Sequence, residues 1–129
     1  NKGKMAAKRI LIIDDAIFQS EILKEVFDNF FGDKVEVEIA KDFLSTQEIL
    51  SKNDCDLILV DYLLGSIGTG AELKDKVKEK IQTKASWMMM SALDVNALAE
   101  QHQGKGFIKF IHKSDYSEMS KEISKALFG

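Results

Sequence analysis

The stretch DLILVDYLLG, residues 56–65, contains an apolar run that ends on a carboxylate, Asp61. Residues 57–60 are all apolar and show no alternation with polar residues, which is typical of a parallel strand covered on both faces. A charge directly after such a strand is unfavourable unless other polar groups meet it. The stretch therefore predicts a buried β-strand that brings Asp61 to a shared polar site at a sheet edge.

Similar segments recur along the chain and alternate with helical patterns. The expected strands are residues 8–13, 35–39, 57–60, 87–90 and 107–111. The expected helices are residues 18–30, 45–50, 71–81, 94–102 and 115–127. Strand and helix alternate five times, which predicts an α/β fold with a five-stranded parallel sheet and helices on both faces.

Length and composition limit the class of protein. The chain has 129 residues, of which 45% are hydrophobic, and this suits one soluble domain. We expect that domain to cover residues 8–129 and residues 1–7 to be a tail, a linker or a vector-derived remnant. The net charge of −3 disfavours direct binding to nucleic acid. No apolar run approaches the ~18 residues of a membrane span, and the single cysteine fits a cytoplasmic protein.

Polar residues follow four of the expected strands. Asp14 and Asp15 follow the first strand, and Asp61 follows the third. Ser91 and Lys113 follow the fourth and the fifth. Because right-handed crossovers bring the carboxyl ends of parallel strands to one edge of the sheet, these side chains should meet there.

The chemistry of this group predicts a metal site. Two carboxylates ~4 Å apart repel each other by about 4 kcal/mol at an effective dielectric constant near 20, so Asp14, Asp15 and Asp61 require a cation. Oxygen ligands with few protein donors suit Mg²⁺. Lys113 adds a mobile positive charge that can approach a phosphoryl oxygen.

The order of these residues resembles that of a receiver domain of a two-component response regulator, which has a flavodoxin-like (βα)5 fold. The resemblance extends from Lys8 to Phe128. It rests on five features in register, which are the acidic pair Asp14-Asp15, Asp61, Ser91, Lys113, and Phe110 with Gly106 four residues before it. In the family, the aspartate after the third strand accepts a phosphoryl group.

The resemblance implies a role for each site residue. Asp61 would be the phosphoacceptor, and Mg²⁺ would be held by Asp15, Asp61 and the backbone carbonyl of Leu63, with Asp14 orienting metal-bound water. The phosphoryl oxygens would contact Ser91 and Lys113.

The resemblance also implies a switch and a set of partners. Movement of Ser91 would let Phe110 rotate inward and would alter the surface made by the fourth helix, fifth strand and fifth helix. The expected partners are a sensor histidine kinase or histidine phosphotransferase and a downstream protein or output domain. A homodimer through the same surface is compatible with the sequence. The protein would be a signalling domain and not an enzyme.

The chain lacks two prolines that the family usually has, one a few residues after the acceptor aspartate and one directly after the lysine. It contains no proline, so Ser114 stands where the family usually has a proline after the lysine, and we predict a trans bond there. Leu63 and Leu93 lie two residues beyond Asp61 and Ser91. Neither can hold an attacking water by a hydrogen bond, which predicts slow loss of the phosphoryl group.

Two other functions remain compatible with parts of the pattern. A pseudo-receiver would keep the fold and the acids but would bind partners without phosphorylation. A small α/β enzyme of the haloacid-dehalogenase or flavodoxin type fits less well, because no Asp-x-Asp-x-Thr motif follows the first strand.

Local patterns give further expectations. Phe18, Ile22, Val26 and Phe30 indicate one apolar helix face, and Ser45 with Glu48 has the spacing of a capping box. We interpret His102 as a surface residue. The lysines expected on a solvated helix face are Lys74, Lys76, Lys78 and Lys80.

Overall fold

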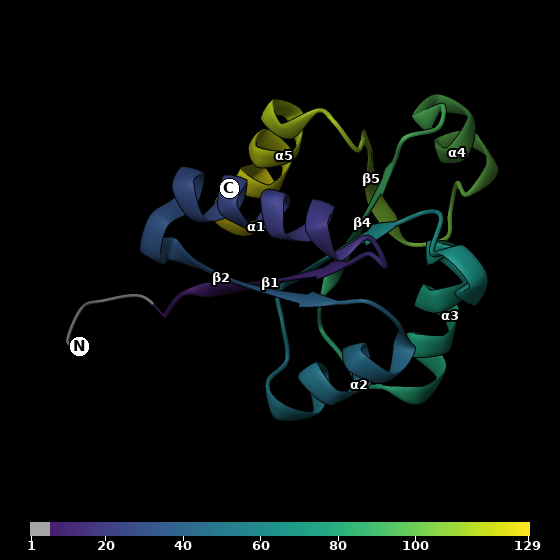
Figure 1. Ribbon diagram of the computed structural model, residues 1–129, viewed down its shortest axis with the longest axis horizontal. Coiled ribbons are helices and arrows are strands. Elements are labelled where there is room, and N and C mark those ends of the chain that lie inside the picture. Colours follow the sequence, from purple (N-terminus) through teal and green to yellow (C-terminus); the bar gives the residue numbers. More distant parts are fainter. Residues whose placement is uncertain (1–5) are drawn as a thin grey trace.

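The computed structural model describes residues 6–129 and contains a parallel five-stranded sheet with strand order β2-β1-β3-β4-β5 (Figure 1). The strands are β1 (Lys8–Ile13), β2 (Val35–Ala40), β3 (Leu57–Asp61), β4 (Ser86–Ser91) and β5 (Phe107–His112). The helices are α1 (Ile17–Phe31), α2 (Phe43–Lys52), α3 (Gly70–Lys80), α4 (Val95–Gln101) and α5 (Tyr116–Phe128). The predicted flavodoxin-like α/β fold is confirmed. Residues 1–5 of the expected tail lie outside the described residues.

Helices cover both faces of the sheet, with α1 and α5 on one side and α2 and α3 on the other (Figure 1). Alternate side chains of β1 and β3 pack into two hydrophobic cores, one on each face of the sheet. The core under α1 and α5 includes Ile10, Ile12, Leu57, Leu59, Phe27 and Ile123. The core under α2 and α3 includes Leu11, Ile13, Ile58, Val60, Leu50 and Val77. Each such side chain contributes about 1.5–3 kcal/mol by burial, which explains why the runs of β1 and β3 do not alternate.

The sequence located helix α1 correctly but assigned the wrong buried face. Phe18 is 79% exposed and Phe30 is 60% exposed. The face that packs on the sheet is offset by one residue from the predicted one and carries Leu23, Phe27 and Phe31. Both stripes have the same four-residue spacing, so periodicity alone cannot distinguish them.

The sequence also misassigned one helix cap. Asp42, not Ser45, begins α2, because the Asp42 carboxylate accepts a hydrogen bond from the Ser45 backbone N–H at 2.9 Å. A capping box that the sequence reading missed starts α3, where Thr69 and Glu72 cap each other. Asp115 caps the start of α5, since its carboxylate accepts from the Glu118 N–H at 3.1 Å. Among the described residues, no helix has the length and apolar character needed to cross a membrane.

Two residues expected at the surface are buried. Lys74 is only 3% exposed, and its Nζ lies 5.7 Å from the centre of the Trp87 ring and 5.5 Å from that of Phe107. Burial lowers the pKa of Lys74. His102 is also buried and lies against the ring of Tyr62. The sequence pattern could not reveal either burial, because the aromatic neighbours of Lys74 come from β4 and β5 and that of His102 comes from the segment after β3.

Candidate functional site

The ends of four strands bring the predicted polar residues together. Ile13 pairs with Val60 in the sheet, so the next residues, Asp14 and Asp61, are neighbours at its carboxyl edge. Ser91 is the last residue of β4. The residues that line one shared pocket of about 630 Å³ include Asp14, Asp61, Ser91 and Lys113. The structure therefore brings Asp14, Asp61, Ser91 and Lys113 together at one end of the sheet, as the order of the strands predicted.

Three carboxylates form an acidic cluster, of which Asp14 and Asp61 line this pocket. Asp14, Asp15 and Asp61 each offer an oxygen, and these oxygens lie within 4.8 Å of one another. Asp14 and Asp61 are buried, whereas Asp15 is exposed. The buried Oδ2 of Asp14 accepts no well-aligned hydrogen bond. An all-oxygen cluster with an under-satisfied buried oxygen fits the donor set that Mg²⁺ prefers.

Lys113 reaches into the cluster. Its Nζ donates a hydrogen bond to Asp61 Oδ2 at 2.9 Å and forms an ion pair with Asp14 Oδ2 at 2.7 Å. No peptide bond among residues 6–129 is cis, so the predicted trans bond between Lys113 and Ser114 is confirmed. If all three acids are ionised, three negative charges and one positive charge leave a net charge of −2, so the pocket retains a demand for further cations.

Burial and charge change the pKa of two site residues. Burial raises the pKa of the Asp61 carboxyl, the nearby Asp14 charge raises it further, and the hydrogen bond from Lys113 only partly opposes this. Burial alone would lower the pKa of Lys113, but its contacts with Asp14 and Asp61 outweigh burial and raise it. Contacts with the two carboxylates therefore favour the charged form of Lys113, whereas burial and the Asp14 charge disfavour the charged form of Asp61.

The loop after Asp61 is short and internally bonded. Leu63 and Thr69 form an isolated antiparallel bridge, and the Leu64 N–H donates to the Gly68 carbonyl at 3.0 Å. Gly70 begins α3 so close to the strand that a Cβ there would overlap the Asp61 carbonyl oxygen. These contacts hold Leu63, whose carbonyl is a predicted metal ligand, beside the pocket that Leu63 also lines.

A second close approach involves Gly65 in the same loop. Its φ of 62° is accessible to glycine, and an added Cβ would lie 2.5 Å from Asp15 Oδ2. The loop backbone therefore passes directly against one of the three acids. A side chain at this position would displace the Asp15 carboxylate.

Ser91 and Phe110 occupy neighbouring strands. The Ser91 side chain is buried, and its Oγ accepts a hydrogen bond from the Leu93 N–H at 3.0 Å. Phe110 pairs in register with Met89, two residues before Ser91, and is only partly buried. Its ring lies 5.5 Å from that of Phe107. The two predicted switch residues are therefore close in the sheet, and part of the Phe110 side chain is exposed.

Sequence reasoning missed the apolar rim of the pocket. Its exposed members are Phe18, Ile22, Leu63 and Tyr116. Phe18 and Ile22 belong to the α1 face that the sequence assigned to the core. The only available signal was that α1 carries two apolar stripes, one more than packing on a sheet requires.

Comparisons with known proteins agree with this arrangement. The family model described as "Response regulator receiver domain" matches residues 10–124. No curated protein gives a significant match.

Similar solved structures include the signal receiver domain of an HD domain-containing protein from Pseudomonas fluorescens Pf-5. That match has 15% identity and a TM-score of 0.78, and it covers 98% of this chain and 91% of the other. The non-phosphorylated HemR receiver domain from Leptospira biflexa has 24% identity and a TM-score of 0.76, with 95% of each chain covered. The receiver domain of the putative response regulator NarL from Mycobacterium tuberculosis has 21% identity and a TM-score of 0.75, covering 97% and 100%.

Proposed function

The chain belongs to the response regulator receiver domain family, and from this premise we propose that it accepts a phosphoryl group on Asp61 with the help of Mg²⁺. The observation that carries this proposal is the contact of Lys113 Nζ with both Asp61 and Asp14 in an acidic pocket. A lysine and an excess of carboxylates in one pocket suit a group that is itself anionic and arrives with a divalent cation.

The proposed reaction is a direct transfer to the Asp61 carboxylate. Lys113 holds Oδ2 of Asp61, which leaves Oδ1 to form the new P–O bond. The P–N bond of a donor phosphohistidine breaks as this bond forms. The leaving imidazole keeps the electron pair and takes up a proton.

The remaining site residues would bind Mg²⁺ or the negatively charged phosphoryl oxygens. Asp14, Asp15, Asp61 and the Leu63 carbonyl would hold Mg²⁺, which when bound offsets negative charge on the phosphoryl oxygens. Lys113 can turn its ammonium from the carboxylate to a phosphoryl oxygen. Ser91 can donate its hydroxyl to another, since that hydroxyl only accepts from a backbone N–H in this structure.

The apolar rim supports a protein as the phosphoryl donor. Phe18 is 79% exposed beside the pocket, and Ile22, Leu63 and Tyr116 extend the same apolar surface. A small phosphodonor needs no such surface, whereas a histidine kinase or histidine phosphotransferase can bury it. The buried cysteine Cys55 fits the cytoplasmic location that the sequence predicts.

The proposed output is a change of binding surface and not catalysis of a further reaction. Movement of Ser91 towards the phosphoryl group would free space for Phe110, which is only partly buried. The surface made by α4, β5 and α5 would then bind a downstream protein, an output domain or a second copy of the chain. β5 is an edge strand of the sheet and exposes half of the Ile108 side chain on this surface.

The decisive experiment is incubation with Mg²⁺ and acetyl phosphate, followed by mass spectrometry of the intact protein. We expect wild type to gain the mass of one phosphoryl group, and Asp61→Asn and metal-free wild type to gain none. Asp33→Asn, which removes an exposed acid far along the chain, is the matched control. Absence of the adduct, together with binding of partners to unphosphorylated protein, would support the pseudo-receiver instead.

A further inference from the structure

The turn between β5 and α5 carries Lys113 and contains only residues 113–115. Two backbone hydrogen bonds fix its ends, from the Lys113 N–H to the Ser91 carbonyl at 2.8 Å and from the Asp115 N–H to the His112 carbonyl at 2.9 Å. Neither bond involves Ser114, which lies between these ends. These two bonds alone do not fix the backbone conformation from Lys113 to Ser114, so another contact is needed to fix it.

The His112 side chain supplies that contact. Its Nδ1 lies 3.2 Å from the Ser114 backbone nitrogen and 2.8 Å from the Ser114 hydroxyl oxygen. A backbone N–H can only donate, so His112 Nδ1 must be an acceptor. The neutral ring then carries its proton on Nε2. Both partners of Nδ1 lie on the residue after Lys113, so the contact closes a small ring around Lys113.

We propose that His112 is a positioning residue for phosphoryl transfer, which acts by fixing the turn that aims Lys113 at Asp61. This rests on the proposed function of Asp61. Lys113 has a flexible side chain, and its Nζ must remain within hydrogen-bond reach of two carboxylates. The ring formed by His112 and Ser114 restricts the backbone of Lys113, as an aspartate or asparagine side chain does when it accepts from the N–H two residues further on.

Three variants separate the hydrogen bond from other effects of the ring. His112→Asn keeps a side-chain acceptor able to reach the Ser114 N–H, and His112→Ala removes it. Ser114→Ala removes the hydroxyl but keeps the backbone donor.

A first measurement does not depend on phosphorylation. Nitrogen NMR of wild type should show the Nε2–H form of His112 and a Lys113 ammonium protected from exchange. His112→Ala should lose the protection of the Lys113 ammonium, and His112→Asn should keep it. A wild-type ring protonated on Nδ1, or an ammonium equally protected in both variants, would overturn the proposal. If wild type accepts no phosphoryl group, the proposed function is wrong. The NMR measurement would still test whether His112 fixes the position of Lys113.

A second measurement compares phosphorylation with metal binding. With acetyl phosphate, which needs no docking surface, His112→Ala should be phosphorylated about three- to tenfold more slowly, the range expected for loss of one hydrogen bond. His112→Asn should recover most of the rate, Ser114→Ala should lose less than His112→Ala, and Mg²⁺ affinity by calorimetry should not fall, because Lys113 is not itself a metal ligand. An unchanged rate in His112→Ala, no recovery in His112→Asn, or a parallel loss of Mg²⁺ affinity or folding would each contradict a positioning role.

Discussion

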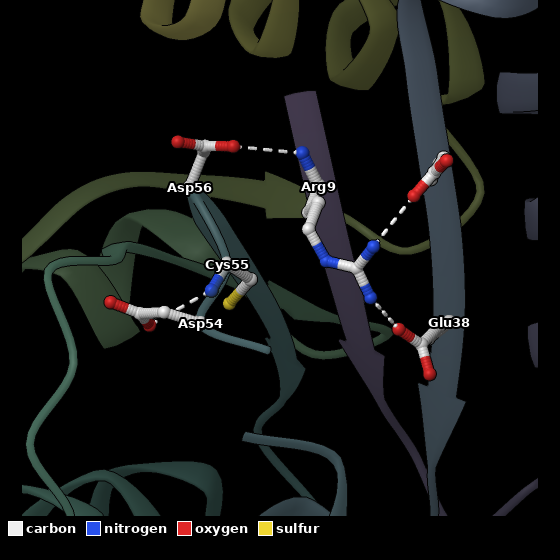
Figure 2. A network of polar contacts seen from close by, with 6 residues as sticks. Arg9, Glu38, Asp54, Cys55 and Asp56 are labelled. Carbon is white, nitrogen blue, oxygen red and sulfur yellow. Dashed lines mark hydrogen bonds and ion pairs between the residues drawn. The ribbon is translucent and has the colours of Figure 1, made fainter. Parts of the chain in front are cut away.

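The two ends of the parallel strands carry the same types of charged residue in different arrangements. We call these ends the amino edge and the carboxyl edge of the sheet. At the amino edge, the Arg9 guanidinium contacts both Glu36 and Glu38, and the Arg9 backbone N–H donates to Asp56 at 2.8 Å (Figure 2). Lys84 adds an ion pair with Asp56. The acids at this edge therefore have cationic or hydrogen-bonding partners without any ligand.

The neighbouring Asp54 carboxylate also has several hydrogen-bond donors without any ligand. Its carboxylate accepts hydrogen bonds from the Thr83 hydroxyl and from the backbone N–H groups of Cys55 and Lys84, which ties the start of β3 to the segment before β4. Figure 2 shows the bond to Cys55 beside the Arg9 network. Burial acts to raise the pKa of Asp54, but these hydrogen bonds outweigh it and hold that pKa below its usual value.

The carboxyl edge leaves its acids short of partners. Asp14 and Asp61 share Lys113, Asp15 lies beside them, and the pKa of Asp61 is raised by burial and by the Asp14 charge. Charges at the amino edge thus stabilise the native state, whereas those at the carboxyl edge are kept at a cost in stability until a ligand arrives. The number of partners that each acid has therefore distinguishes a structural charge network from a functional one better than residue type does.

The largest expected effect comes from removing the cation of the carboxyl edge. Lys113→Met should lower the free energy of unfolding by about 2–3 kcal/mol in EDTA, because Asp14 and Asp61 then lose their buried counter-charge. Mg²⁺ should restore part of the loss. Urea denaturation measures both. Lys84→Met, which removes an exposed lysine at the amino edge, is the control and should change stability by less than about 1 kcal/mol. Equal losses in the two variants would remove the contrast between the edges.

The next largest effect tests the amino edge. Arg9→Met should destabilise the protein by about 1–2 kcal/mol, because Glu36 and Glu38 lose their shared partner and then repel each other. Phosphorylation by acetyl phosphate and Mg²⁺ affinity should remain at wild-type values. A loss of either, in protein that is still folded, would show that the two edges are coupled.

A smaller effect of opposite sign is expected for the phosphoacceptor. Asp61→Asn should stabilise the metal-free protein by roughly 1 kcal/mol at neutral pH, because it removes a charge that burial and Asp14 disfavour. The folded-state pKa of Asp61 is raised, so this cost exists above that pKa and disappears as the pH falls through it. Thermal unfolding of Asp61→Asn and wild type should therefore converge towards acidic pH. Asp33→Asn is the control, and a gap that widens on acidification would contradict the assignment.

The smallest effect concerns the lifetime of the phosphorylated state. Leu63→Gln should speed loss of the phosphoryl group from Asp61 by about threefold, since an amide can hold an attacking water by a hydrogen bond where leucine cannot. Decay of the phosphorylated mass in Mg²⁺ buffer measures the rate. Leu44→Gln changes an even more exposed leucine on α2 and should decay as wild type does. Loss of phosphate from wild type within seconds would refute the expectation of slow decay.

The residues that meet at the strand ends could be predicted from the sequence. The apolar runs that precede Asp14, Asp61 and Ser91 locate the strands, and right-handed crossovers bring their carboxyl ends to the same edge. The fold needed no further information. Helix faces were less predictable, since Phe18 and Phe27 both lie on four-residue stripes and only packing against the sheet distinguishes them.

The position of Lys113 depended on a loop, and loop geometry was not predictable from spacing. Its contact with Asp14 requires a turn that the contact of His112 with Ser114 supports, and that contact has no sequence signature of its own. The burial of Lys74 was missed for a similar reason, because Lys74 lies on α3 and the Trp87 and Phe107 rings around it come from β4 and β5. Residues are predictable where backbone pairing places them and are harder to predict where side chains from distant elements meet.

The placement of Lys113 after the last strand has a consequence for how the chain is made. The acids Asp14, Asp15 and Asp61 are synthesised long before their cation, since proteins grow from the amino terminus at about 5–20 residues per second. Until residue 113 emerges, pairing of β1 and β3 brings these carboxylates together without the lysine that contacts Asp14 and Asp61 in the complete fold. Addition of β5 to the edge of the sheet therefore supplies the missing charge and the last strand in one step, and it links completion of the site to completion of the fold.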